Sequence, residues 1–350
     1  MDNKITMASI AEACGTSIGT VDRALHNRGE INSETKKRIL DTARQLGYKS
    51  NTFAGALSRR RTIRLAIISC ENHRDFFSNV SKGIKAAENE LEQYGVKIDI
   101  LCSENLSVSE QMKLLSEIDI SCYDGFAINP SGSEINKWIN NCYSSNIPVI
   151  TFNNDAPESN RLFYIGNDAQ SAGSLAGEIV GKMLRGNGTA ATLNSSLTAI
   201  TYDDRSNGFI QTITSDYPGI SVIKNQCYYN DESSAYHAVI KLLNDNPELS
   251  ALYATRYTGT VGAIRALKFL NRKDIILIGH DIGKETVDAL ECNWCSAVLF
   301  QNPFKQGYYA ASLLAKHILE SWLPEKKKML IPTQVFFKNN YIENQDPILK

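Results

Sequence analysis

The side chains that could do chemistry in this chain gather in short segments that follow apolar runs. Seven such segments carry carboxylate, amide or guanidinium groups, four of them together with aromatic or hydroxyl side chains: Glu71–Phe77, Asn129–Ser131, Asn153–Asp155, Tyr202–Arg205, Arg256–Thr258, Asp281 and Gln301–Pro303. A small-ligand site needs both kinds of group, because fixed polar atoms orient the ligand and aromatic faces cover its apolar side. These segments are therefore the first candidates for a functional site.

No grouping of these residues predicts catalysis or metal binding. The sequence has neither a Gly-rich phosphate loop ending in Gly-Lys-Ser nor a His-Glu-x-x-His helix, and its five histidines are scattered. Cys292 and Cys295 have the spacing of half a zinc or redox site, but no second Cys or His pair lies near them in the sequence. We expect no enzyme activity, no cofactor and no metal ion.

The elements that must position the seven segments alternate in type. Short apolar runs typical of buried strands alternate with amphipathic stretches over about 270 residues, which predicts parallel α/β sheets divided between two lobes. In such sheets ligands bind at the carboxyl ends of the strands, where the seven segments lie. The expected elements are Arg64–Ser69, Ser78–Tyr94, Lys97–Cys102, Glu110–Ile118, Gly125–Ile128, Ile135–Ser144, Pro148–Phe152, Ala172–Leu184, Ala190–Leu193, Asn207–Thr214, Ser221–Gln226, Ala235–Asp245, Ala251–Ala254, Val261–Leu270, Ile275–Gly279, Lys284–Glu291 and Cys295–Phe300.

The amino-terminal residues have the pattern of three short amphipathic helices. Thr6–Thr16 has a capping hydroxyl, apolar residues at helical spacing and a glycine near its end. Ser17–Leu25 predicts a second helix capped by its first residue, and a third runs from residue 32 or 33 to Leu46. Two short helices joined by a Gly-containing turn are typical of a helix-turn-helix unit, although small helical modules also bind proteins.

Charge favours DNA as the partner of this helical part. The 350-residue chain has a formal net charge of -1, but its first 64 residues hold 12 Lys and Arg against 6 Asp and Glu. The rest of the chain holds 25 Lys and Arg (37 minus 12) against 32 Asp and Glu (38 minus 6), so its net charge is negative. A basic module such as the first 64 residues is drawn to phosphates. No apolar run reaches the roughly 20 residues of a membrane span, and the first residues lack the apolar core of a secretory signal. We expect a cytoplasmic protein without a membrane partner.

Four stretches, Ser9–Glu12, Ser17–Leu25, Gly47–Tyr48 and Asn51–Leu57, resemble the DNA-binding domain of the lactose-repressor (LacI/GalR) family of bacterial transcription regulators. The resemblance implies that the start of the second helix contacts the operator through Ser17, Ile18, Gly19, Thr20, Asp22 and Arg23. An arginine can bind guanine through a bidentate fork and an apolar side chain can contact a thymine methyl, whereas hydroxyls suit phosphates. Family members usually have Ser where Asp22 stands, so the operator that this chain prefers does not follow from the family resemblance.

The same resemblance implies a hinge helix that carries Asn51, Ala54 and Leu57. Such a helix folds on the minor groove, where Leu57 of each subunit would wedge between base pairs and bend the DNA. The segment is too short and glycine-containing to be a stable helix alone, so we expect it to be disordered without DNA. Arg59–Arg61 fits either a solvated linker or contacts to the DNA backbone.

Six further stretches, Asp75–Phe77, Ile147–Asn154, Ile165–Asp168, Asp204–Phe209, Ile278–Asp281 and Gln301–Pro303, resemble sugar-binding proteins of the ribose-binding type, which form the sensor of many LacI/GalR regulators. The resemblance spans Ile63 to about Phe337 and implies a ligand cleft between the lobes lined by Arg74, Phe76, Phe77, Asn153, Asn154, Arg205, Arg256, Asp281 and Gln301. Phe76 and Phe77 could instead be core residues, and Asp281 could cap the following helix.

Departures from the sugar-binding pattern bear on the effector. Asn153-Asn154 stands where relatives typically have Asp-Arg, and Arg74 and Arg256 stand where they typically have Asn. The implied cleft then holds three Arg against one Asp, which favours an acidic effector such as a uronic acid, another sugar acid or a phosphorylated sugar. Asp155 and Glu71 could instead neutralise these arginines.

These inferences give an all-α helix-turn-helix domain over residues 1–50, a hinge helix and linker over 51–62, and a two-lobed α/β domain with parallel sheets, like periplasmic binding proteins, over 63–340. We expect a homodimeric regulator that binds a pseudo-palindromic operator in double-stranded DNA, with an affinity that a sugar or acidic sugar derivative changes. The tail after Phe337 has no apolar heptads, which favours a dimer over a coiled-coil tetramer. Two alternatives are a sugar-modifying enzyme with an accessory DNA-binding domain and a constitutive DNA-binding protein with a degenerate cleft.

Overall fold

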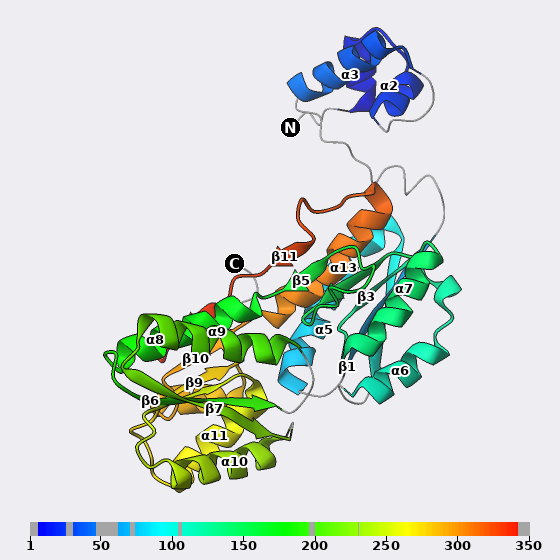
Figure 1. Cartoon of the computed structure of the whole chain (residues 1–350). Helices are drawn as coiled ribbons and strands as arrows, with labels where there is room; N and C mark the ends of the chain where they lie inside the picture. Colours follow the sequence, from blue (N-terminus) through cyan, green and yellow to red (C-terminus); the bar gives the residue numbers. More distant parts are fainter. Residues whose placement is uncertain are drawn as a thin grey trace. The chain divides into compact units, whose positions relative to one another are not determined.

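The computed structural model describes residues 6–25, 31–46, 62–70, 74–103, 107–195, 200–229 and 231–341. The chain divides into two compact units, Met1–Arg60 and Arg61–Lys350, which we call the head and the body (Figure 1). Within the described residues, no helix is long and apolar enough to cross a bilayer.

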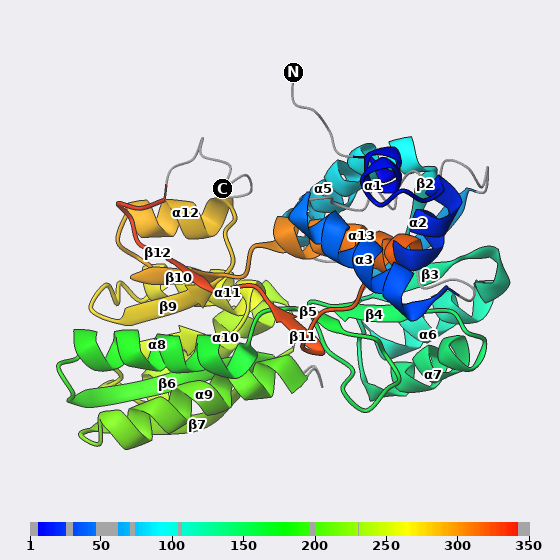
Figure 2. The same ribbon diagram turned by 90° about the horizontal axis from the view of Figure 1, so that it is seen from above.

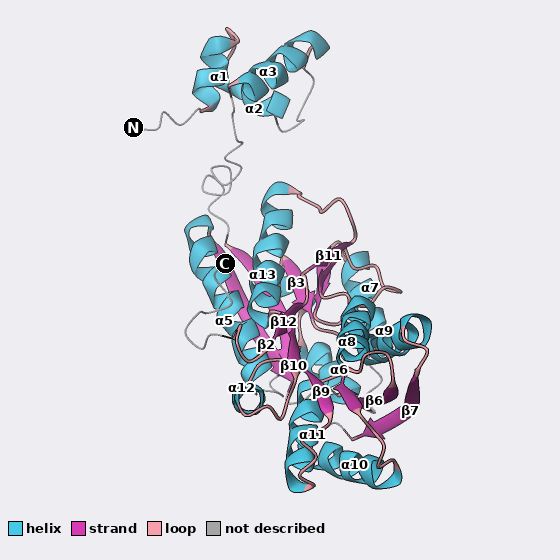
Figure 3. Cartoon of the chain, turned by 90° about the vertical axis from the view of Figure 1, so that its left-hand side faces the viewer, coloured by secondary structure: helices cyan, strands magenta, loops and turns pink. Residues whose placement is uncertain are grey.

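Three helices form the described part of the head: α1 (Met7–Ala13), α2 (Ile18–Leu25) and α3 (Ser33–Gln45). Figure 3 shows the three helices packed together. Each helix contributes apolar residues to one small core, in which Ile10, Val21 and Ile39 are fully buried. Side chains satisfy exposed N–H groups at all three helix starts, since Thr6 caps α1, Ser17 caps α2 and Asn32 caps α3. The three helices lie where the sequence predicts them, within a few residues at each end.

The body contains two six-stranded sheets with the same spatial order of strands. The first sheet runs β2 (Val96–Ser103), β1 (Ile63–Cys70), β3 (Gly125–Ile128), β4 (Val149–Phe152), β5 (Tyr164–Gly166) and β11 (Lys328–Leu330), and all neighbours are parallel. The second runs β7 (Ile220–Tyr228), β6 (Gly188–Ser195), β8 (Ala251–Ala254), β9 (Ile276–His280), β10 (Ala297–Phe300) and β12 (Gln334–Phe336), where β12 is antiparallel to β10. Strands buried on both faces read as continuous apolar runs, which is why the sequence predicted most of them.

Helices cover both faces of the first sheet and complete the amino-terminal lobe (Figure 2). One face packs against α5 (Arg74–Leu91) and α13 (Pro303–Glu320), and the other against α6 (Val108–Glu117) and α7 (Asn136–Ser144). Short 3-10 turns lie at Glu92–Tyr94, Ile120–Cys122 and Ser133–Ile135. Two glycines let α5 and α13 touch, because a Cβ at Gly83 or Gly307 would collide with a backbone carbonyl of the other helix.

The carboxyl-terminal lobe has the same three layers around the second sheet. Helices α8 (Ala169–Met183) and α9 (Ile200–Asp216) cover one face, and α10 (Glu232–Asp245) and α11 (Tyr257–Phe269) cover the other (Figure 1). Helix α12 (Lys284–Glu291) packs on the same face as α10 and α11. The predicted two-lobed α/β fold with parallel sheets is confirmed.

Three segments join the lobes, and several elements beside them were not predicted. The chain passes between the sheets after β5, after β10 and after β11. The sequence did not predict α13, nor β5, β11 and β12, the three-residue strands next to the connections. Strands this short have no apolar run to detect, whereas the buried residues of α13 begin with Pro303, Gln306 and Gly307 and are regularly apolar only after them.

Candidate functional sites

One face of α2 is exposed and carries the residues predicted to contact DNA. Val21 and Ala24 face the core of the head, whereas the side chain of Ile18 is 52% exposed. An isoleucine that stays exposed while its helix buries other apolar residues is available for a contact with a partner. Gly19 adds open space to this face, because no atom lies near the position that its Cβ would occupy except Ser17 Oγ at 3.9 Å.

Hydrogen bonds fix the polar side chains at the start of α2. Ser17 caps the helix through a bond of 3.2 Å from the Thr20 N–H, and the two hydroxyl oxygens are 2.9 Å apart. Arg23 lies along the same face, where its Nε donates to the Gly19 carbonyl at 3.2 Å and Nη2 donates to Thr20 Oγ1 at 3.4 Å. The predicted contact residues Ser17, Ile18, Gly19, Thr20 and Arg23 therefore form one surface, and Asp22 is half-buried beside it. Asn51, Ala54 and Leu57 of the predicted hinge helix lie outside the described residues.

A buried polar network joins the strand ends of the carboxyl-terminal lobe. Arg205 on α9 donates through Nη1 to the Thr255 carbonyl at 2.8 Å and through Nη2 to Gln301 Oε1 at 2.9 Å. Gln301 Nε2 in turn lies 3.1 and 3.0 Å from the two carboxylate oxygens of Asp281. The sequence predicted these three residues as one site, and the structure brings them together.

Asp281 sits in an environment that favours its neutral form. Burial raises the pKa of Asp281 to about 6, and Arg205, the bond from Gln301 and Arg256 partly oppose this shift. Arg256 is buried and precedes α11 as its N-cap residue. The alternative that Asp281 caps the next helix does not hold, because Gly283 occupies the N-cap position of α12 and Thr286 completes the cap.

The amino-terminal lobe presents amides at its strand ends. Asn153 Nδ2 donates to Gln306 Oε1 at 3.2 Å, and Asn154 Nδ2 donates to the Pro130 carbonyl at 3.1 Å. Phe76 and Phe77 pack edge to face in the core of this lobe, which is the alternative considered for them. The side chain of Arg74 lies outside the described residues.

Sequence reasoning missed two buried glutamines that support these loops. Gln111 on α6 donates to the Asn129 carbonyl at 2.8 Å and accepts from both the backbone N–H and the hydroxyl of Ser131 at 2.8 Å. Gln306 on α13 contacts Asn153. A polar residue on the buried face of an amphipathic helix was the available signal for Gln111, whereas Gln306 was missed with its helix.

Three strand ends at the interface of the lobes share an unusual backbone conformation. Asn153 after β4, Asp281 after β9 and Asn302 after β10 have φ angles of 62°, 66° and 51°. Asn and Asp tolerate this left-handed region better than other non-glycine residues, and such residues cluster at functional sites. The other described non-glycine residues with positive φ follow helix ends, where this conformation is common.

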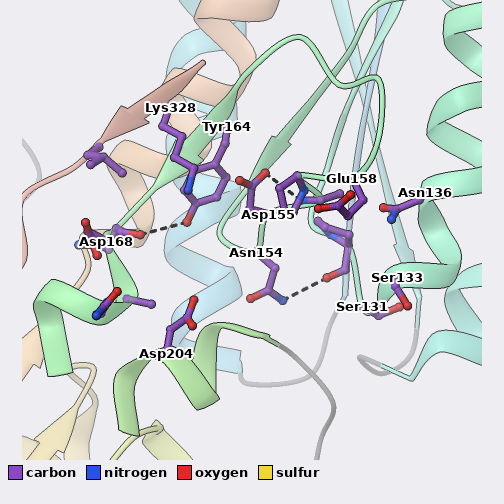
Figure 4. A pocket seen from close by; sticks show the side chains of 18 of the residues that line it. Ser131, Ser133, Asn136, Asn154, Asp155, Glu158, Tyr164, Asp168, Asp204 and Lys328 are labelled. Atoms are coloured by element: carbon purple, nitrogen blue, oxygen red, sulfur yellow. Dashed lines mark hydrogen bonds between the residues drawn. The ribbon is translucent and has the colours of Figure 1, made fainter. Parts of the chain in front are cut away.

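A cavity of about 510 Å³ is lined by both lobes (Figure 4). Its lining includes Asn154 and Ser131 from the amino-terminal lobe and Asp168 and Asp204 from the carboxyl-terminal lobe. Asp155 also lines it, but this carboxylate binds Arg161, with Nη2 of Arg161 at 2.7 Å, and does not neutralise the predicted arginines of the cleft. Of the predicted ligand residues, Asn154 is in the lining.

Known families match both parts of the chain. Residues 6–51 match bacterial regulatory proteins of the lacI family, and residues 65–320 match the periplasmic binding protein domain. The ribose import binding protein RbsB of Haemophilus influenzae is 25% identical over 77% of this chain and 88% of its own length. The HTH-type transcriptional regulator RegA of Clostridium saccharobutylicum is 24% identical over 79% of this chain and 82% of its own length.

Among solved structures, GanP, a glucose-galactose binding protein from Geobacillus stearothermophilus, matches with a TM-score of 0.74 and 26% identity. The match covers 80% of this chain and 99% of GanP. These proteins are regulators and binding proteins, and both resemblances seen in the sequence are confirmed. The chain belongs to the periplasmic binding protein domain family and carries, at residues 6–51, the DNA-binding domain of the lacI family of bacterial regulatory proteins.

Proposed function

We propose that this protein is a transcription regulator that binds an operator through α2 and changes its DNA affinity when a carbohydrate binds between the lobes of the body. The observation that carries the proposal is the presence, in one chain, of an exposed α2 face and a two-lobed body with buried polar groups at its strand ends. We infer repression by a homodimer on a pseudo-palindromic site, because a two-fold symmetric protein reads two half-sites.

The proposed effector site contains Asn153, Asn154, Arg205, Arg256, Asp281 and Gln301. Arg205 and Arg256 both act on Asp281 electrostatically, so the described charges of this set are two cations and one carboxylate. A carboxylate on the sugar would accept paired hydrogen bonds from the guanidinium groups of this net cationic set. We therefore propose a sugar acid as the effector, with Arg74 as a further candidate for contact, whereas Phe76 and Phe77 pack in the core.

DNA reading by α2 can be tested without knowledge of the operator. The full-length protein is incubated with fragmented bacterial genomic DNA at physiological salt, and the retained fragments are sequenced. We expect a short palindromic sequence for the wild type. Arg23→Ala should change or relax one position of that sequence, because a bidentate contact to guanine is worth about 1–3 kcal/mol of discrimination.

Arg44→Ala is the matched control for this selection. Arg44 is an exposed residue near the end of α3, so its loss removes the same charge without touching α2. It should weaken binding to all DNA alike and keep the selected sequence. Retention of fragments with no shared sequence by the wild type would contradict sequence-specific reading.

The effector class can be tested by calorimetry with matched sugar pairs. D-Galacturonate is compared with D-galactose, and D-glucuronate with D-glucose, so that each pair differs at the carboxylate. We expect one acid to bind more tightly than its neutral partner, and Arg205→Met to reduce its affinity by about 100-fold, since the lost contact is a buried charged hydrogen bond. Tighter binding of neutral sugars throughout would refute the acidic effector and leave carbohydrate sensing intact.

The two alternative functions make different predictions. A sugar-modifying enzyme would hydrolyse a nucleotide in the presence of its sugar, and we expect no turnover in such an assay. A constitutive DNA-binding protein would show no change in melting temperature with any ligand, whereas a regulator is stabilised by its effector.

A further inference from the structure

Gln306 lies where the connections between the lobes meet. It is on the first turns of α13, directly after the second connection, and its side chain is 0% exposed. A glutamine is rarely buried completely, and its amide must then find partners for two N–H groups and one carbonyl oxygen.

The amide of Gln306 contacts three separate segments. Nε2 donates to Asn167 Oδ1 at 3.2 Å, in the first connection, and to the Gln301 carbonyl at 3.0 Å, in the second. Oε1 accepts from Asn153 Nδ2 at 3.2 Å, in the loop after β4. One side chain thus binds two connections and one loop of the proposed effector site.

Asn167 extends the contacts to the third connection. Its Nδ2 donates to the Ile331 carbonyl at 2.9 Å and to Thr333 Oγ1 at 3.1 Å, and both residues lie between β11 and β12. The Tyr164 hydroxyl also lies 2.8 Å from the Asn153 carbonyl and 3.2 Å from that of Asn167. All three connections are therefore joined through two buried amides.

The pattern of donors and acceptors fixes both amides in one orientation. Each nitrogen uses its two N–H groups, and each oxygen accepts one bond, so neither amide has an unused donor. A flip of Gln306 would place its oxygen against two carbonyl oxygens and its nitrogen against the Asn153 N–H groups. A buried network of this kind is stable only when it is complete.

We propose that Gln306 is a positioning residue that ties the effector loop at Asn153 to the three connections, so that the loop and the angle between the lobes change together. The proposal rests on the regulator function proposed above. It adds the route by which a ligand in the effector site affects the three connections between the lobes. An effector that draws the Asn153 amide toward itself removes the bond to Gln306 Oε1 and leaves a buried acceptor unpaired. The network can then recover only by rearrangement of the connections.

Hydrogen exchange of the full-length protein, without DNA or sugar, tests this link. Gln306→Met keeps the length of the side chain and removes its hydrogen bonds. We expect exchange to become about 10-fold faster or more in all three connections, for example at the Ile331 amide, bonded to Gly166, and also at the Asn153 amide after β4, bonded to Ile165. Acceleration confined to the first turn of α13 would overturn the proposal.

Gln111→Met is the matched control in the same lobe. Gln111 is also a buried glutamine with three hydrogen bonds, but its partners lie in the Asn129–Ser131 loop. Its loss should accelerate exchange around that loop and leave the three connections unchanged. Acceleration of the connections by this variant as well would show general loosening of the lobe, and the proposal would fail.

Thr333→Val provides a milder test if Gln306→Met does not fold. It removes one acceptor at the far end of the network and keeps the shape of the side chain. We expect faster exchange around Asn167 and in the first turn of α13. In a variant that carries both Gln306→Met and Thr333→Val, the two increases in exchange rate should be less than additive, since both changes break one network.

Additive effects in Gln306→Met with Thr333→Val, or no effect of Thr333→Val at α13, would assign the two residues to independent structural roles. Because the measurement uses neither DNA nor sugar, its failure would leave the regulator function standing. A failure to select DNA or to bind a sugar would in turn leave the exchange result unchanged.

Discussion

The two lobes of the body share one strand order but hold their buried charges in different ways. In the amino-terminal lobe, Arg161 and Asp155 form a direct ion pair with side chains 5% and 17% exposed, and Arg161 also donates to the Lys327 carbonyl at 3.3 Å. In the carboxyl-terminal lobe, Arg205 reaches Asp281 through the amide of Gln301.

The difference separates a structural pair from a set of groups that can exchange partners. A direct buried pair is held by both partners, and each would be left unpaired without the other. An amide between two charges donates to one and accepts from the other, so a ligand with a carboxylate or hydroxyls can replace it at either side. We therefore assign Arg161 and Asp155 to the stability of the loop after β4, and Arg205, Gln301 and Asp281 to binding.

The largest expected effect concerns the direct pair. Arg161→Met should lower the free energy of unfolding by about 3–5 kcal/mol, because it leaves the Asp155 carboxylate buried without its cation. Denaturant unfolding of the full-length protein measures the change. Arg64→Met is the control, since Arg64 and Asp99 form an exposed pair at 2.7 Å that should contribute less than about 1 kcal/mol. Equal losses in the two variants would erase the distinction between buried and exposed pairs.

The next effect concerns the pH dependence of stability that Asp281 causes. Its pKa is about 6 in the folded protein, against 3.8 as the ordinary value, so the folded state holds a proton that the unfolded state releases between about pH 4 and 6. Stability falls as pH rises through this window, by up to about 3 kcal/mol.

Asp281→Asn removes this proton, so the free energy of unfolding of the wild type minus that of the variant should fall from pH 4 to 7. Carboxylates elsewhere titrate in both proteins and cancel in the difference. A difference that stays constant with pH would place Asp281 in a more polar environment than the network indicates.

The smallest effect concerns the amide between the charges. The bond from Gln301 lowers the pKa of Asp281, so Gln301→Met should raise that pKa further and extend the titration window to higher pH. The measurement is the same stability profile, recorded for Gln301→Met and for Gln301→Met with Asp281→Asn. An unchanged window would mean that Gln301 does not connect the two charges.

The sequence predicted the main elements and much of the proposed site for physical reasons that also mark its limits. Long apolar runs such as β1 and β9 are visible because both faces of the strand are buried, and α2 is visible because its capping serine and apolar spacing are local. Arg205, Asp281 and Gln301 follow predicted strands or begin a helix at one sheet edge, so their proximity could be inferred from topology alone.

The three connections between the lobes could not be inferred in this way. β5, β11 and β12 have three residues each and gain their stability from neighbouring strands, and Asn167, Gln306 and Thr333 come together only after those strands pair. Phe76 and Phe77 show the same limit, because an aromatic pair at a strand end has the same pattern whether it faces a ligand or the core. Tertiary contacts decide between these outcomes.

The most direct test of the regulator function is a titration of the selected DNA with the full-length protein, with and without a saturating concentration of the sugar that calorimetry finds to bind. Fluorescence anisotropy of the labelled DNA gives the affinity. We predict that the sugar changes operator affinity by about 5- to 150-fold in the wild type, the usual range of such coupling, and has no effect in Arg205→Met. Equal affinity with and without a sugar that binds the wild type would contradict effector control of DNA binding.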